Sequence, residues 1–300
     1  MERNLNLPNL LIVGAAKSGT TSLHNYLMQH PKIFMSQHKE PHFLINKEIG
    51  INRIHKAVID INEYKNLFAN TNSFKYRGES SVMYLPFFNI SIKNIRKYLD
   101  KSVKVIIMLR NPVDRAYAGY LHNLRYNPSE NLSFEEALER SEDRYHSDLY
   151  MSPDTRYLYV GKYFSQVNSF LKEFKDNVHV ILYDDYASDI NLCLQNIFDF
   201  LEIEKINIDT SKRHMQGGWI FRSSFARNII IPKNKYKSFI KKIIPFQNFR
   251  SKIKQNVLNL LSVKTKEMSP EIRKKLIKYY REDILKLSKV LNTNLDNWLK

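Results

Sequence analysis

Cysteine is almost absent from this chain, and so are the long apolar runs that cross a membrane. Its 300 residues include one cysteine, Cys193, so neither an internal disulfide nor a zinc site with several cysteines can form. No apolar run approaches the length of about 18 residues that a membrane span requires. The short apolar stretch near the N-terminus leads directly into a glycine loop, so we expect a strand there rather than a signal peptide. These features predict a cytoplasmic location.

Acidic residues are missing from one long stretch. Between Asp209 and Glu267 there is no Asp or Glu, whereas 14 lysines and arginines lie there. The formal net charge of +17 is therefore concentrated, and residues 1–209 are close to balanced. This pattern predicts an anionic partner, for which nucleotide phosphates, an acidic glycan, nucleic acid and an anionic membrane surface all qualify. A lysine-rich solvated surface is the alternative.

The aromatic content of the basic stretch narrows these partners. It matches the 12% of the whole chain, so it adds no sign of base stacking, and we do not expect nucleic acid as a partner. Peripheral contact with a membrane surface stays open.

Strand and helix patterns alternate along the chain, which predicts a parallel sheet with crossover helices. Apolar runs predict strands at 9–13, 103–109 and 178–183, and residues 75–80 are a further, short strand candidate. Helical spacing predicts helices at 20–30, 89–100, 112–124, 133–140, 159–174, 190–201 and 269–291. We expect one three-layer α/β/α domain over residues 1–300, similar to P-loop folds. Residues 210–266 within it are expected to form a basic, irregular lid or substrate-facing segment.

The most informative motif follows the first predicted strand and reads GAAKSGTTS, residues 14–22. A strand, a glycine loop and a helix start form an anion cradle, because backbone N–H groups and the positive end of the helix point at the ligand. Lys17 adds a full positive charge from within the loop. In a P-loop NTPase the lysine directly follows the second glycine, where this chain has Thr20. The candidate anion-binding residues are Lys17, Ser18, Gly19, Thr20, Thr21 and Ser22.

The residues after the later strands do not complete a Walker-type metal site. The strand at 103–109 is followed by Arg110, at a place where an acidic Mg²⁺ ligand might be sought. An arginine favours direct neutralisation of an anion, so no metal is expected. Asp184 and Asp185 follow the next strand, and we expect them to cap a helix.

Two of these motifs resemble the sulfotransferases that use 3′-phosphoadenosine 5′-phosphosulfate (PAPS), in particular the carbohydrate and heparan-sulfate type and its bacterial relatives. Residues 14–22 are similar to the family's 5′-phosphosulfate loop. LRNPVDRAYA, residues 109–118, is similar to its 3′-phosphate motif. The resemblance implies that Arg110 is the principal 3′-phosphate ligand. Ala118 stands where the family has a serine, so one phosphate contact is expected to be missing.

Three further stretches extend the resemblance. HKEPHFL, residues 38–44, is similar to the segment that carries the family's proposed catalytic base, which points to Glu40. GESSVMYL, residues 78–85, resembles a segment in which some members have a substrate-binding lysine where this chain has Ser80. GGWIFRS, residues 217–223, falls where the family closes over the 3′-phosphate and adenine, which implies Arg222 as a further contact.

Sulfuryl transfer requires a cation at the leaving oxygen and a base for the acceptor proton. Because the bridging oxygen of PAPS gains negative charge, Lys17 is suited to stabilise it without a metal. Glu40 is the candidate base, and His42 is a second catalytic candidate that could instead orient the substrate.

The expected function is therefore transfer of a sulfuryl group from PAPS to a hydroxyl or amine, with release of the bisphosphate PAP. A carbohydrate and a small secondary metabolite are both open as acceptors. A metal-dependent P-loop nucleotide kinase is an alternative that Thr20 disfavours. A non-catalytic binder of anionic polymers is another, and it predicts binding that weakens steeply with salt.

Overall fold

The structure is a computed structural model, and it describes residues 7–212, 217–223, 226–227 and 260–300. Its centre is a five-stranded sheet in the order β2-β3-β1-β4-β5, in which every neighbouring pair is parallel. The bounds are β1 Leu10–Gly14, β2 Ile33–Met35, β3 Tyr76–Ser80, β4 Lys104–Leu109 and β5 Val178–Leu182. A separate antiparallel pair joins β6 (Trp219–Phe221) to β7 (Ser262–Lys264).

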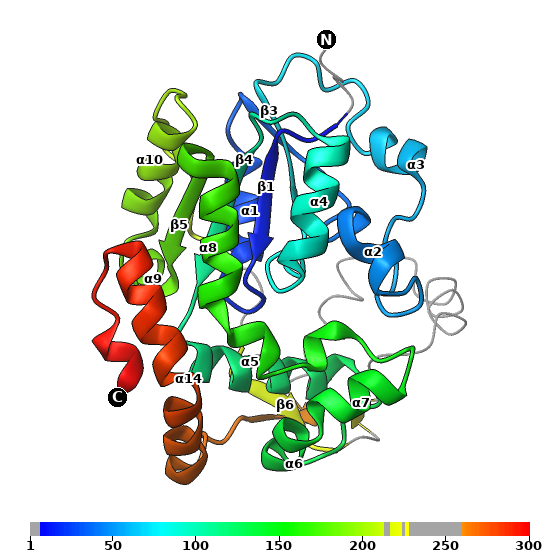
Figure 1. Ribbon diagram of the computed structural model, residues 1–300, viewed down its shortest axis with the longest axis vertical. Helices are drawn as coiled ribbons and strands as arrows, with labels where there is room; N and C mark the ends of the chain where they lie inside the picture. The colour runs from blue at the N-terminus through cyan, green and yellow to red at the C-terminus, as the bar shows by residue number, and fades with distance from the viewer. Residues whose placement is uncertain (1–6, 213–216, 224–225, 228–259) are drawn as a thin grey trace.

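Helices surround the central sheet (Figure 1). The α-helices are α1 Thr20–Leu27, α2 Phe43–Ile49, α3 Ile61–Asn66, α4 Phe88–Tyr98, α5 Pro112–Tyr126, α6 Phe134–Glu139, α7 Ser141–Ser147, α8 Tyr163–Phe174, α9 Tyr183–Ser188, α10 Ile190–Phe200 and α14 Pro270–Leu291. The 3₁₀ helices are η1 Pro153–Thr155, η2 Tyr159–Gly161, η3 Lys175–Asn177 and η4 Asp296–Leu299. None of the helices in the described ranges combines the length and the apolar content that crossing a bilayer requires.

The sheet is buried on both faces. Leu11 and Val13 of β1 pack into a core shared with α4, α8 and α14. Leu10 and Ile12 pack into a second core on the opposite face, shared with α1 and α10. Because successive side chains of a strand point to opposite faces, a strand covered on both sides is apolar throughout. This arrangement confirms the expected three-layer α/β/α fold with a parallel sheet.

The carboxyl end of β1 points toward α5, which lies with α6, α7 and β6 in the lower part of Figure 1. Asn111 starts α5, since its side chain accepts a hydrogen bond from the Val113 N–H at 3.0 Å, and Pro112 occupies the first helical position. Arg110, directly before this cap, donates from Nη1 to the Lys17 carbonyl oxygen at 3.3 Å. The loops after β1 and β4 therefore meet at the same edge of the sheet.

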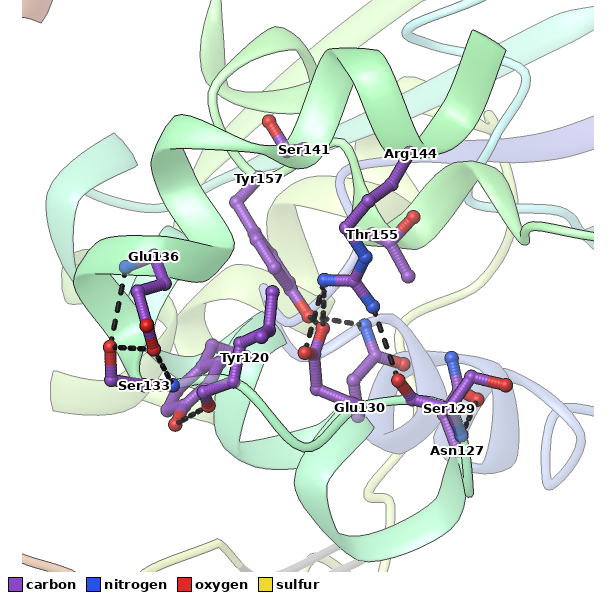
Figure 2. A network of polar contacts seen from close by, with 12 residues as sticks. Tyr120, Asn127, Ser129, Glu130, Ser133, Glu136, Ser141, Arg144, Thr155 and Tyr157 are labelled. Atoms are coloured by element: carbon purple, nitrogen blue, oxygen red, sulfur yellow. Dashed lines mark hydrogen bonds and ion pairs between the residues drawn. The ribbon is translucent and has the colours of Figure 1, made fainter. Parts of the chain in front are cut away.

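The far end of α5 is held by buried polar contacts (Figure 2). The buried carboxylate of Glu130 accepts from Arg144 Nη1 at 3.1 and 3.2 Å and from the Tyr157 hydroxyl at 2.6 Å. Arg227 donates to the carbonyl oxygens of Leu124 and Glu130 at 3.2 and 3.3 Å. The last turn of a helix leaves carbonyls without intrahelical partners, and Arg227 satisfies one of them. The end of α5 is thus tied to α7 and to the chain around η1.

Every strand and helix expected from the sequence is present, with shifts at the ends. The expected helix 159–174 begins as η2 and becomes α8 only at Tyr163. The sequence did not predict β2, a three-residue strand defined by its pairing with β3, or the short helices α2, α3, α7 and α9. Asp184 and Asp185 lie in the first turn of α9 and do not cap it. Much of the expected lid, at 213–216, 224–225 and 228–259, lies outside the described residues.

Candidate active site

A cleft of about 1550 Å³ opens at the carboxyl edge of the sheet. In open α/β sheets this edge is where ligands bind. The cleft brings together most of the residues expected from the sequence: Lys17, Gly19, Thr20, Thr21, Ser22, Glu40, His42 and Arg110. Ser18 belongs to the loop but is fully buried, and Arg222 is exposed; neither lines the cleft.

The loop before α1 needs glycine at one position. Gly19 adopts a φ of 90°, a left-handed value that side chains disfavour. A Cβ atom there would also lie 3.3 Å from both Met108 Cε and Tyr186 Cε1. Gly19 offers no side chain to cap α1, so the first N–H groups of this helix stay available for an anion.

Lys17 lies inside the loop and contacts α5. Its Nζ is 3.2 Å from Nδ1 of His122. Burial and the nearby Arg125 guanidinium lower the pKa of Lys17 to about 8. Burial, the Lys17 ammonium and the Arg125 guanidinium lower the pKa of His122 to about 3, so this imidazole is neutral. A protonated Lys17 therefore donates to the His122 Nδ1 lone pair.

Glu40 lines the same cleft from the turn that precedes α2. Its Oε1 is 2.6 Å from Lys39 Nζ, and its side chain is 38% exposed. Burial raises the pKa of this carboxyl, but the Lys39 ammonium and His42 outweigh burial, and the net shift is downward. Glu40 is consequently ionised at neutral pH and able to accept a proton.

His42 supports the same turn from within. It is 2% exposed, and its Nδ1 is 2.8 Å from the Glu40 carbonyl oxygen, to which it donates as a neutral ring. Burial lowers the pKa of His42 more than Glu40 raises it. Its Nε2 has no hydrogen-bond partner among the described residues. This geometry favours a role for His42 in positioning the Glu40 turn. A catalytic role for His42 stays a prediction.

A buried carboxyl anchors the Glu40 turn to the sheet. Glu79, at the end of β3, accepts from the hydroxyls of Tyr64, Tyr84 and Ser81 at 2.9, 2.7 and 2.7 Å. Ser81 Oγ in turn accepts from the His42 N–H at 3.0 Å. Burial raises the pKa of Glu79 to about 7. The sequence placed Glu79 in a recognisable motif without indicating this anchoring role.

Glu79 makes the stability of the protein depend on pH. Its pKa in the folded chain, about 7, lies above the ordinary value of 4.5, so the folded state binds the proton more tightly. That stabilisation is complete below about pH 4.5 and is lost as pH rises through 7. The free energy of unfolding of the wild type is expected to fall by about 3 kcal/mol between pH 4.5 and pH 8 because of Glu79. Glu79→Gln should lack this fall. Urea unfolding between pH 4.5 and 8 measures it.

The exposed surface residue Glu139 provides the matched control. Glu139→Gln should keep the wild-type slope of unfolding free energy against pH. Parallel slopes for wild type and Glu79→Gln would show that Glu79 does not titrate in this range.

The sequence reasoning missed several residues of the cleft wall. Arg115, Ala118, His122 and Arg125 follow one another on α5 at intervals of three, four and three residues and all line the cleft. This spacing places them on one helix face, so continuing the face that starts at Arg115 would have found the last two. Asp154, in η1, also lines the cleft, and no local pattern marks it.

Residues 7–292 match the sulfotransferase domain family. This chain belongs to that family. It is 27% identical over 247 residues to carbohydrate sulfotransferase 15 of Rattus norvegicus, covering 66% of this chain and 44% of that protein. It is 28% identical over 177 residues to the human bifunctional heparan sulfate N-deacetylase/N-sulfotransferase 1, covering 58% of this chain and 20% of that protein. The chain thus spans less than half the length of these curated relatives.

A solved structure supports the same family assignment. The crystal structure of a sulfotransferase from Alicyclobacillus acidocaldarius matches with a TM-score of 0.74 and 28% identity, over 98% of this chain and 99% of that chain. Membership in the sulfotransferase family confirms the resemblance read from residues 14–22 and 109–118. It supports a transferase of the sulfotransferase class.

Proposed function

We propose that this protein transfers a sulfuryl group from PAPS to a hydroxyl or amine of an acceptor and releases PAP. The observation that carries the proposal is the position of Lys17. Its ammonium lies inside the anion-binding loop against a neutral His122, in the same cleft as the ionised Glu40. A fixed cation and an ionised carboxylate that line one cleft suit the transfer of a group that leaves as an anion.

The donor is expected to lie along the loop and the start of α5. The N–H groups of the loop at 18–22 and the hydroxyls of Thr20, Thr21 and Ser22 would bind the 5′-phosphosulfate. Arg110, stacked 4.8 Å from the centre of the Tyr183 ring, would bind the 3′-phosphate. Lys264 and Lys266 line the same cleft and add positive charge. The part expected of Arg222 stays a prediction.

The transfer requires one bond to form and one to break. The acceptor oxygen or nitrogen forms a bond to sulfur while the bond from sulfur to the bridging oxygen breaks, and that electron pair stays on PAP. Lys17 stabilises the negative charge that develops on the bridging oxygen. Glu40 takes the proton that the acceptor loses. His42, hydrogen-bonded to the Glu40 main chain, would hold the base in place.

The nature of the acceptor belongs to this proposal. The relatives described above are named for carbohydrate and heparan sulfate substrates, which favours a sugar hydroxyl or amine. A small metabolite is the alternative acceptor. The cytoplasmic location expected from the sequence also stays a prediction.

Purified protein incubated with ³⁵S-labelled PAPS and a panel of sugar and small-molecule acceptors tests the activity directly. Label should move to at least one acceptor, and calorimetry should detect PAP binding. If PAP does not bind and ATP binds only with Mg²⁺, the nucleotide kinase replaces this proposal. If heparin binds with steep salt dependence and no label moves, the non-catalytic binder does.

Arg110→Ala is expected to weaken PAP binding by at least about tenfold, because a charge-assisted hydrogen bond to the 3′-phosphate is lost. Isothermal titration calorimetry measures the affinity. Arg96→Ala is the matched control, since Arg96 pairs with Glu173 at the surface and lies outside the cleft. Equal affinity for PAP in both variants would contradict the 3′-phosphate assignment.

A further inference from the structure

We propose that Arg125 binds an oxyanion carried by the acceptor, a carboxylate or a sulfate group, next to the point of sulfuryl transfer. The cleft would thereby select anionic acceptors. This inference rests on the proposed sulfotransferase function and adds a determinant of acceptor specificity to it.

Arg125 is a nearly buried cation without a counter-ion. It is 5% exposed and lines the cleft. Its Nε donates to the Leu121 carbonyl oxygen of the same helix at 3.1 Å. The rings of Trp219 and Tyr126 lie with their centres 5.2 and 5.7 Å from the guanidinium carbon. Within the described ranges, no carboxylate pairs with it.

Two nearby arginines donate from their Nη atoms to acceptors of the protein. Arg144 pairs with the Glu130 carboxylate, and Arg227 donates to main-chain carbonyl oxygens. A buried charge without a partner is costly. An arginine that tolerates this cost at the wall of a cleft, with its planar fork free, is suited to bind a carboxylate or sulfate.

The course of α5 places Arg125 on the acceptor side. At the start of the helix, Arg110 contacts the Lys17 main chain, and further along, His122 contacts the Lys17 ammonium. Because an α-helix rises about 1.5 Å per residue, Arg125 lies about 5 Å beyond His122, away from Arg110. The nucleotide is expected at the Arg110 end and the sulfuryl group at Lys17. An anion at Arg125 therefore belongs to the molecule on the far side of the sulfuryl group.

Arg125 also lies close enough to Lys17 for their charges to interact. Its guanidinium is, after burial, the largest cause of the lowered pKa of Lys17. Trp219 of β6 places its ring against the guanidinium, and only 5% of Arg125 is exposed. Shielding from water strengthens the attraction between the guanidinium and an anion that enters the cleft.

The experiment uses the 300-residue chain loaded with PAP and two probes that differ in charge. D-glucuronate and D-glucose share a sugar ring, but only glucuronate carries a carboxylate. Saturation-transfer NMR should detect glucuronate binding to wild type, weaker binding of glucose, and displacement of glucuronate by inorganic sulfate. Arg125→Met should weaken glucuronate binding by about tenfold and leave glucose unchanged. Arg125→Lys keeps the charge but lacks the planar fork, so its affinity for glucuronate should lie between those of wild type and Arg125→Met.

Calorimetry with PAP and PAPS shows whether the oxyanion at Arg125 belongs to the acceptor or to the sulfuryl group of the donor. If Arg125 serves the acceptor, Arg125→Met binds both nucleotides as wild type does. Selective loss of PAPS affinity would assign Arg125 to the donor's sulfuryl group and overturn the proposal. So would equal binding of glucuronate and glucose by wild type. The exposed residue Arg140 supplies the control Arg140→Met, which should change neither probe. Failure of wild type to bind PAP would instead refute the proposed function itself.

Discussion

Lys17→Ala is expected to lower kcat for sulfuryl transfer by about 10³-fold, because a preorganised cation at the leaving oxygen is lost. Affinity for PAP should fall much less, since Arg110 and the loop N–H groups are untouched. The same role predicts that kcat/KM of wild type declines as pH rises through about 8, where Lys17 loses its proton. Transfer of label from ³⁵S-PAPS, measured from pH 6 to 9.5, tests both expectations.

The control for this variant is Lys172→Ala, a change of an exposed lysine on α8 outside the cleft. It should retain wild-type kcat and the wild-type pH profile. If Lys17→Ala kept more than about a tenth of the wild-type kcat, Lys17 would not be the residue that stabilises the transition state. Stabilisation of the leaving oxygen by a fixed cation is expected to raise kcat by far more than tenfold.

Glu40→Gln is expected to lower kcat by at least about 100-fold and to leave PAP affinity within about twofold of wild type. Loss of a general base costs about 10²–10⁴ in rate, whereas an amide of nearly the same shape preserves the turn before α2. Single-turnover assays with preloaded PAPS isolate the chemical step, and calorimetry measures PAP binding.

The comparison of Glu40→Gln with Lys17→Ala separates the two roles. If both variants lost PAP affinity equally, the assignment of Glu40 to the acceptor and Lys17 to the donor would be wrong. Glu139→Gln is the matched control at an exposed site on α6 and should not change kcat. A Glu40→Gln enzyme with wild-type kcat would point to another base in the cleft, such as Asp154.

The residues expected to bind the donor could be placed at one edge of the sheet from the sequence, because they lie in short segments next to strands. Lys17 and Gly19 lie in the loop after β1, Arg110 directly follows β4, and parallel strands bring their carboxyl ends to one edge. Asp154 was missed because only the packing of η1 brings it to the cleft, whereas His122 and Arg125 lie on the α5 face that begins at Arg115 and that the helical spacing could have revealed. Glu79 was recognised as part of a motif, but its hydroxyl partners come from α3 and the turn after β3. Such convergence is set by tertiary structure, which no short pattern records.

The Glu130–Arg144–Tyr157 network lies away from Lys17, yet it holds the end of α5 that carries Arg125. The opposite end of that helix is held by Asn111 and Arg110 at the expected nucleotide site. The expected donor site and the proposed site for the acceptor's anion thus lie at different ends of one helix with separate supports. Substitutions in α7 or around η1 could therefore retune acceptor preference while nucleotide binding is preserved. Relatives that share the donor loop are free to diverge in substrate through residues that never touch it.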